Sequence, residues 1–330
     1  MRRALEASKS RIVRVLRLCR PVVEHLKLFR AAIYAALEHD SLTVAQATAY
    51  SAMVALFPAL IVSAAIVAWL PDTLPFRLQM SIFFDRILPS NVSPLLESYF
   101  EATHKSPQTA RALIGSVVVS VTGAASVMAT LMEGFRRAHN LPLEAAGFWR
   151  RRMRALALVP LSLLPMCVAS ALVVFGHIIT QWMAGHFALE ARTPFYILAF
   201  VVRWSVALAG SVGIIAVIYH LGTDITKHMR EHMEPFLAFH MDWSWRSSLP
   251  GATLATAMWF VTTLGFGYYV TRYANYSQVY GSLGAAIALM FWLYLIAFSV
   301  LVGAEFNAQL GADRRRAGKI PDPPAVLEVP

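Results

Sequence analysis

Residues 273–304, YANYSQVYGSLGAAIALMFWLYLIAFSVLVGA, form a run of 32 residues without Asp, Glu, Lys or Arg. A helix needs about 20 apolar residues to cross the hydrocarbon core of a bilayer, so this run can hold one spanning helix. Backbone groups in lipid must be hydrogen bonded within the protein, and a helix achieves this within one segment. The stretch therefore predicts a helical membrane protein.

Five more uncharged runs precede this one, at 41–71, 112–132, 155–189, 204–223 and 247–271. Each can cross a membrane once. We therefore predict an all-α polytopic membrane protein of about six transmembrane helices with flanking interfacial helices, the spans lying near 46–70, 112–132, 156–182, 195–219, 251–271 and 283–305. Charged residues make up 15% of the 330 residues and hydrophobic ones 57%, which excludes an ordinary water-soluble enzyme and a disordered chain.

The distribution of Lys and Arg predicts the orientation in the membrane. The net charge is +10, and 22 of the 29 basic residues fall in segments on one side of the six spans, against six on the other side. Basic loops are retained in the cytoplasm. We therefore expect a multi-pass protein with both the N-terminus and the C-terminus in the cytoplasm.

The chain divides into three regions. Residues 1–43 form a basic amphipathic arm, which we interpret as interfacial helices on anionic lipid headgroups; a solvated basic tail is the alternative. Nucleic-acid binding is not expected, because no known module accompanies the charge. Residues 44–310 hold the six-helix domain, with an outer loop at 71–111 and cytoplasmic loops at 133–154 and 220–249. Residues 311–330 are expected to be a disordered cytoplasmic tail.

Two segments resemble one known family. The first is Ala49-Tyr50-Ser51-Ala52 with Leu56-Phe57-Pro58-Ala59-Leu60, and the second is Tyr280-Gly281-Ser282-Leu283-Gly284-Ala285 with Trp292-Leu293-Tyr294 and Gly303-Ala304-Glu305-Phe306-Asn307-Ala308. They are similar to the opening and ending motifs of the YihY/virulence factor BrkB family. Pro250-Gly251-Ala252 and Phe148-Trp149-Arg150 extend the resemblance to roughly residues 30–310.

The resemblance implies a bacterial inner-membrane protein with six helices and no agreed biochemical activity. Some members carry the label ribonuclease BN, and others are linked to serum resistance or to lipid and solute export. The sequence departs from the family after Tyr219-His220, where a longer stretch rich in His and Met follows.

No catalytic motif is found in the sequence. A zinc phosphodiesterase would need a His-x-His-x-Asp-His cluster, and no two histidines are two residues apart. Asp224, His228 and His232 are spaced by four residues and would share one face of a helix, so a divalent metal could bind there. A polar face or a pH-sensing face is the alternative. No other cofactor is expected.

The candidate substrate-binding residues are Arg203, Glu305, Tyr50 and Pro58. Arg203 is the only charge well inside a predicted span, where it binds an anion, snorkels to the outer interface or bonds to carbonyls. Glu305 is either a gate or coupling residue or a helix-end carboxylate that is solvated or paired with a cytoplasmic Arg. Pro58 frees a backbone carbonyl that lines a cavity or only kinks the helix. Tyr50 lies in the first family motif.

We therefore expect a transport-type protein for an anionic or amphipathic, lipid-like substrate. The alternatives are a non-transporting membrane scaffold for envelope integrity and, third, a membrane-bound hydrolase. The expected partners are membrane lipids, and the sequence leaves a homo-oligomer open.

Overall fold

The computed structural model describes Glu24 and residues 26–69, 107–140, 149–163, 189–223, 245–272 and 283–316. Apart from short turns, these residues are helical, and none lies in a strand. The long helices are α2 (Ser41–Trp69), α5 (Pro107–Ala138), α7 (Leu189–Gly222), α10 (Trp245–Arg272) and α12 (Leu283–Arg316). Residues 26–38 and 149–163 form two shorter helical segments.

Five helices in the described part of the chain are long and apolar enough to cross a membrane. They contain the spans predicted near 46–70, 112–132, 195–219, 251–271 and 283–305, apart from residue 70. The prediction of an all-α polytopic membrane protein is confirmed. Most of the third predicted span, 156–182, lies outside the described residues, as do the start of the N-terminal arm, most of the outer loop and the chain after 316.

Helix α12 extends farther than the sequence predicted. It continues to Arg316, so residues 311–316, which we expected at the start of a disordered tail, are helical. The reason is local: no proline follows Glu305 until Pro321, and Gly311 alone does not end a helix. Arg314, near the end of the helix, also interacts favourably with the negative end of the helix dipole.

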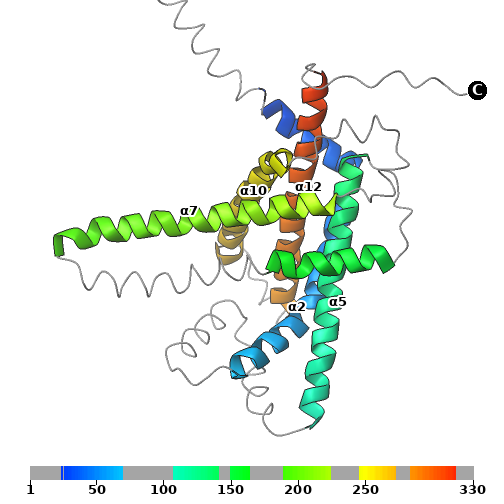
Figure 1. Cartoon of the computed structure of the whole chain (residues 1–330), viewed down its shortest axis with the longest axis vertical. Helices are drawn as coiled ribbons and strands as arrows, with labels where there is room; N and C mark the ends of the chain where they lie inside the picture. Colours follow the sequence, from blue (N-terminus) through cyan, green and yellow to red (C-terminus); the bar gives the residue numbers. More distant parts are fainter. Residues whose placement is uncertain are drawn as a thin grey trace, which may run out of the picture.

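The core is built around α12, which contacts α2, α5 and α10 (Figure 1). Helices α2 and α5 pack as an antiparallel pair, with Ala55 next to Gly123 and Val44 next to Gly134. The fully buried side chains of Phe135 and Leu301 lie in the main core cluster. Val44, Gly134, Phe135 and Leu301 lie toward the end of the bundle that also holds His39, Tyr219, Ser248 and Glu305, and we call it the polar end.

Helices α10 and α12 also run antiparallel and touch through their backbones at the polar end. A Cβ atom on Gly251 would collide with the carbonyl oxygen of Gly303, and one on Gly303 would collide with the Tyr219 hydroxyl. Small residues let membrane helices approach this closely and gain van der Waals contact. The two glycines therefore set the distance between α10 and α12.

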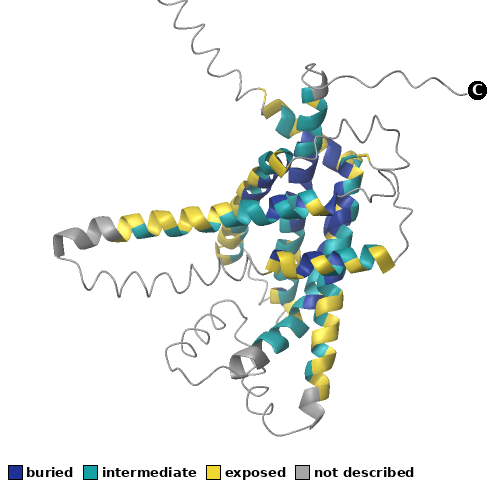
Figure 2. Ribbon diagram, in the orientation of Figure 1, coloured by how far each residue is buried: buried dark blue, intermediate teal, exposed yellow. Residues whose placement is uncertain are grey.

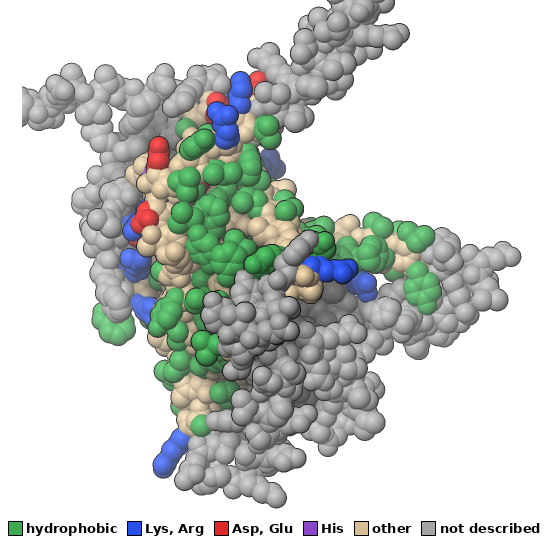
Figure 3. Space-filling model, turned by 180° about the vertical axis from the view of Figure 1, so that it is seen from behind, with side chains coloured by type: hydrophobic (Ala, Val, Ile, Leu, Met, Phe, Trp, Pro, Cys, Tyr) green, Lys and Arg blue, Asp and Glu red, His purple; other side chains and the backbone are tan. Residues whose placement is uncertain are grey.

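The surface of the described helices is largely apolar. Exposed residues dominate the first half of α5 and the first half of α7 (Figure 2). The first half of α7 extends away from α2, α5 and α12. Seen from behind, hydrophobic side chains cover the middle of the visible surface, and Asp and Glu appear toward its upper end (Figure 3). This pattern suits helices that face lipid along most of their length.

Candidate functional site

A buried carboxylate lies at the centre of the polar end. Glu305 of α12 has no exposed surface, and its Oε1 atom lies 2.8 Å from Nδ1 of His39. An ionised carboxylate can only accept hydrogen bonds, so Nδ1 of His39 carries the hydrogen in that state. The other oxygen, Oε2, is buried without a hydrogen-bond partner among the described residues. Among the described residues, the partner of Glu305 is thus a histidine, whereas the sequence analysis considered a carboxylate that is solvated or paired with a cytoplasmic Arg.

The turn that carries His39 is fixed by Asp40. Asp40 has a φ of 58°, in the left-handed region that Asp tolerates better than most residues. Its carboxylate accepts a 2.7 Å hydrogen bond from the Thr43 hydroxyl, and its carbonyl accepts one from the backbone N–H of Val44. These bonds begin α2 and join it to the segment 26–38. The turn thereby places His39 against the end of α12.

Asn307 ties the start of α10 to α12, one turn or less beyond Glu305. Its side-chain oxygen accepts a 2.6 Å hydrogen bond from the backbone N–H of Gly251, and its side-chain amide donates to the carbonyl of Ser248 at 3.1 Å. Pro250, inside α10, has no N–H to donate. The side-chain amide of Asn307 therefore bonds to backbone groups of α10 at the point where Pro250 interrupts the helical hydrogen-bond pattern.

Tyr219 connects α7 to the same site. Its hydroxyl donates a hydrogen bond to the carbonyl of Val300 on α12. The ring of Phe135 on α5 packs edge-on against the Tyr219 ring, with 5.1 Å between centroids. A buried tyrosine needs a partner for its hydroxyl, and this bond supplies it. Four elements, 26–40, α5, α7 and α10, thus converge on the Glu305 region of α12.

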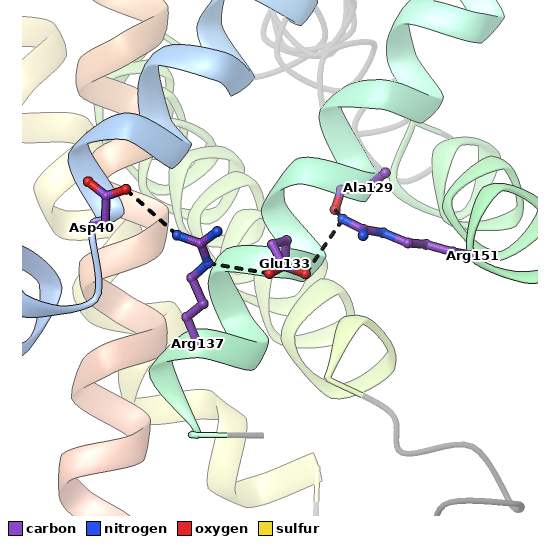
Figure 4. A network of polar contacts seen from close by, with 5 residues as sticks. All are labelled: Asp40, Ala129, Glu133, Arg137 and Arg151. Atoms are coloured by element: carbon purple, nitrogen blue, oxygen red, sulfur yellow. Dashed lines mark hydrogen bonds and ion pairs between the residues drawn. The ribbon is translucent and has the colours of Figure 1, made fainter. Parts of the chain in front are cut away.

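An ion-pair network lies on the α5 side of the polar end (Figure 4). Glu133 pairs with Arg137 at 3.3 Å and with Arg151 at 3.6 Å, and Arg137 also pairs with Asp40 at 3.7 Å. Arg151 donates to the carbonyl of Ala129 as well. The side chains are partly exposed, so each pair adds little stability on its own. The network does link α5, the 39–40 turn and the segment 149–163.

Arg203 does not belong to the Glu305 site. It is half-buried on α7, and its Nε atom is buried without a hydrogen-bond partner among the described residues. Sixteen residues separate it from Tyr219, which is about 24 Å along a helix. Arg203 thus lies in the part of α7 that extends away from the core.

The other two candidates lie on α2. Tyr50 is 66% exposed, and Pro58 is half-buried inside the helix. In the described part of the chain, no hydrogen bond or ion pair joins any two of Arg203, Glu305, Tyr50 and Pro58. The structure does not gather them into one pocket.

The predicted metal ligands Asp224, His228 and His232 lie outside the described residues. Within the residues that are described, no group of three or more His, Cys, Asp or Glu could hold a metal ion. A metal site at residues 220–232 stays a prediction.

Sequence reasoning missed the partners of the candidates. Gly251 and Asn307 were noted only as parts of motifs, and His39 was not singled out. The pairing of Glu305 with His39 spans 266 residues, so no local periodicity reports it. The one available signal was that His39 directly precedes Asp40-Ser41, a helix-capping pattern that fixes the position of α2.

A family model named virulence factor BrkB matches residues 32–326. The chain is 26% identical to a Bacillus subtilis protein named, provisionally, ribonuclease-like protein YfkH, over 86% of the chain and 94% of that protein. It is 27% identical to a UPF0761 membrane protein of Tolumonas auensis, over 86% of the chain and 85% of the relative. A UPF0761 membrane protein of Rhodospirillum centenum is 25% identical over 86% of the chain and 56% of its own length. No solved structure matches the chain.

Proposed function

Since the chain belongs to the virulence factor BrkB family of membrane proteins, we propose that it is a transport-type protein that moves an anionic or amphipathic, lipid-like substrate across the bacterial inner membrane. The protein is multi-pass in this proposal, with both termini in the cytoplasm. It has no catalytic role, and the ribonuclease-like name of the Bacillus relative is not carried over to it.

One observation supports the proposal: two charged side chains within the spans each keep a buried polar atom without a hydrogen-bond partner among the described residues. These atoms are Nε of Arg203 and Oε2 of Glu305. Leaving a buried polar group unsatisfied costs about 1–3 kcal/mol, and more for a charged group. Charged residues inside spans usually mark substrate or ion pathways. A purely structural scaffold would not need either group.

The charge of Arg203 indicates the substrate class. It is the only charged residue in the described part of α7 between Tyr196 and Gly222. A guanidinium is planar and can donate two parallel hydrogen bonds to a phosphate or carboxylate, which a lysine cannot do. A phospholipid fits the proposed substrate class, because its phosphate is anionic and is attached to apolar chains.

The test is movement of NBD-labelled phosphatidylglycerol in proteoliposomes, read by dithionite quenching. The unchanged protein should accelerate its movement between leaflets relative to empty vesicles. Arg203→Gln should lower the initial rate at least about tenfold, the equivalent of about 1.4 kcal/mol, and Arg203→Lys should give a rate between the two. Arg111→Gln, which changes an exposed Arg at the start of α5, is the matched control and should keep the rate.

Two results would count against the proposal. A well-folded Arg203→Gln protein with full activity removes Arg203 from the substrate path. No movement of labelled phosphatidylglycerol or of a labelled soluble anion by the unchanged protein, together with a stable membrane partner, favours the scaffold function instead.

A further inference from the structure

A groove runs between α10 and α12, away from the polar end. It has a volume of about 550 Å³, within the range of small-molecule sites. The α10 wall presents Thr262, Gly265, Phe266 and Tyr269, and the α12 wall presents Ile287, Phe291 and Leu295. Residues spaced by three or four lie on one helix face, so each wall is one continuous stripe. The lining is mostly apolar.

The groove arises because the two helices touch closely at one end only. At the polar end, a Cβ atom on Gly251 would strike the backbone of α12, whereas a Cβ atom on Gly265 would meet nothing within 4 Å. The rings of Phe266 and Phe291 contact each other, with 5.8 Å between centroids, and join the walls. Beside them, Nε1 of Trp292 donates to the Thr263 hydroxyl at 3.3 Å. The groove is therefore a shaped feature of a bonded helix pair.

The length and position of the groove suit a hydrocarbon chain. Residues 287–295 cover about 12 Å of helix, close to the roughly 15 Å depth of one leaflet of a hydrocarbon core about 30 Å thick. The groove lies within two of the candidate spans. It is continuous with exposed apolar side chains of α10, including Val261 and Leu264, which is the surface that a membrane helix turns toward lipid. Acyl chains thus have direct access to it.

A basic residue stands at the end of the α10 wall. Arg272 is exposed and follows Gly265 by seven residues and Tyr269 by three, which places it on the same helix face, one turn beyond the groove. Tyr and Arg at the end of a span are typical of the headgroup region. The positive charge complements the phosphate of a lipid whose chain occupies the groove.

We propose that the groove between α10 and α12 binds one acyl chain of an anionic phospholipid, with the lipid phosphate against Arg272. The site is separate from Arg203 and Glu305, and it does not depend on transport. The lipid fills the space beside Gly265 and packs against the rings of Phe266 and Phe291.

The experiment measures the melting temperature of the purified full-length protein in mild detergent, with and without added long-chain phosphatidylglycerol. A ligand that binds only the folded state raises the melting temperature. The unchanged protein should show this rise. Gly265→Leu, which fills the groove, should abolish it. Gly267→Leu is the matched control, because a Cβ atom there also meets nothing within 4 Å and the residue does not line the groove; it should keep the rise.

Arg272→Gln tests the headgroup contact. It should reduce the rise given by phosphatidylglycerol to the level given by phosphatidylcholine of the same chain length. Glycerol 1-phosphate, which has the phosphate but no chain, should give no rise. If Gly265→Leu does not fold, Leu295→Trp fills the groove from the α12 wall and should have the same effect.

Equal rises in the unchanged protein and in a folded groove-filling variant would overturn the proposal, as would a full rise with glycerol 1-phosphate. An undiminished preference for phosphatidylglycerol in Arg272→Gln would overturn the headgroup contact. None of these results bears on Arg203, so failure of this site and failure of the transport proposal can be told apart.

Discussion

Gly251 is the residue whose replacement should be least tolerated. A methyl group there would collide with the Gly303 carbonyl and with the side chain of Asn307, at the point where α10 and α12 touch. Overpacking a close contact costs about 1–3 kcal/mol, occasionally more. Gly251→Ala should therefore lower the melting temperature in detergent by several degrees.

Gly210→Ala is the control for this change. Its Cβ atom meets nothing within 4 Å, and alanine favours a helix more than glycine does, so the melting temperature should stay or rise slightly. A Gly251→Ala protein as stable as the Gly210→Ala protein would show that the helices do not touch at this point.

The contact between His39 and Glu305 should behave as a coupled pair. His39→Ala leaves a fully buried carboxylate without its hydrogen bond, and leaving a buried polar group unsatisfied costs about 1–3 kcal/mol. Glu305→Gln keeps the size and can still bond to the imidazole, so it should cost less. The protein with both changes should lose less stability than the sum of the losses from the two single changes.

Thermal or denaturant unfolding of the four proteins in detergent measures this coupling. Additive losses in the double mutant would mean that the two side chains do not interact in the folded protein.

At the scale of elements, the segment 149–163 is attached to α5 by two arginines. Arg152 donates to the Ser126 hydroxyl and to the Thr122 carbonyl, at 2.9 and 2.8 Å. Hydrogen bonds from a charged group contribute about 1.5–3 kcal/mol when well shielded, and less when partly exposed as here. Arg152→Ala should increase amide hydrogen exchange in the segment 149–163 and leave α10 and α12 unchanged.

Arg150→Ala is the matched control, because Arg150 is exposed on the same segment. It should leave the exchange as it is in the unchanged protein. If the segment 149–163 exchanges equally in the Arg152→Ala protein and in the unchanged protein, the hydrogen bonds of Arg152 do not hold this segment in place.

The helices could be predicted from the sequence, because a spanning helix requires a long run without charged residues, and such a run is visible in the local sequence. The predicted span 283–305 lies inside α12 for this reason. The contacts of α12 around Glu305 could not be predicted, since their partners His39, Tyr219 and Ser248 come from distant segments, and only the packed helices bring them together. The groove was also missed, because Phe266, Gly265 and Phe291 look like ordinary lipid-facing residues in the sequence.

At the scale of the whole molecule, the polar end should lie on the cytoplasmic side. Among the described residues, Arg30 before α2, Arg137 at the end of α5 and Arg246 at the start of α10 lie toward this end, and basic segments are retained in the cytoplasm. Reporter fusions after residues 140, 235 and 325 should therefore report cytoplasm, and fusions near 90, 187 and 276 should report periplasm. A cytoplasmic signal from a fusion at position 90 would contradict this topology.

The central place of α12 bears on how the protein is made. Of the described helices, α12 leaves the ribosome last, yet α2, α5 and α10 all pack against it. Chains are inserted from the N-terminus during synthesis. The faces of the earlier helices that contact Leu301 and Glu305 therefore stay uncovered in the membrane until α12 is made. Biogenesis thus passes through a stage in which His39 and Tyr219 are present but have not met their partners.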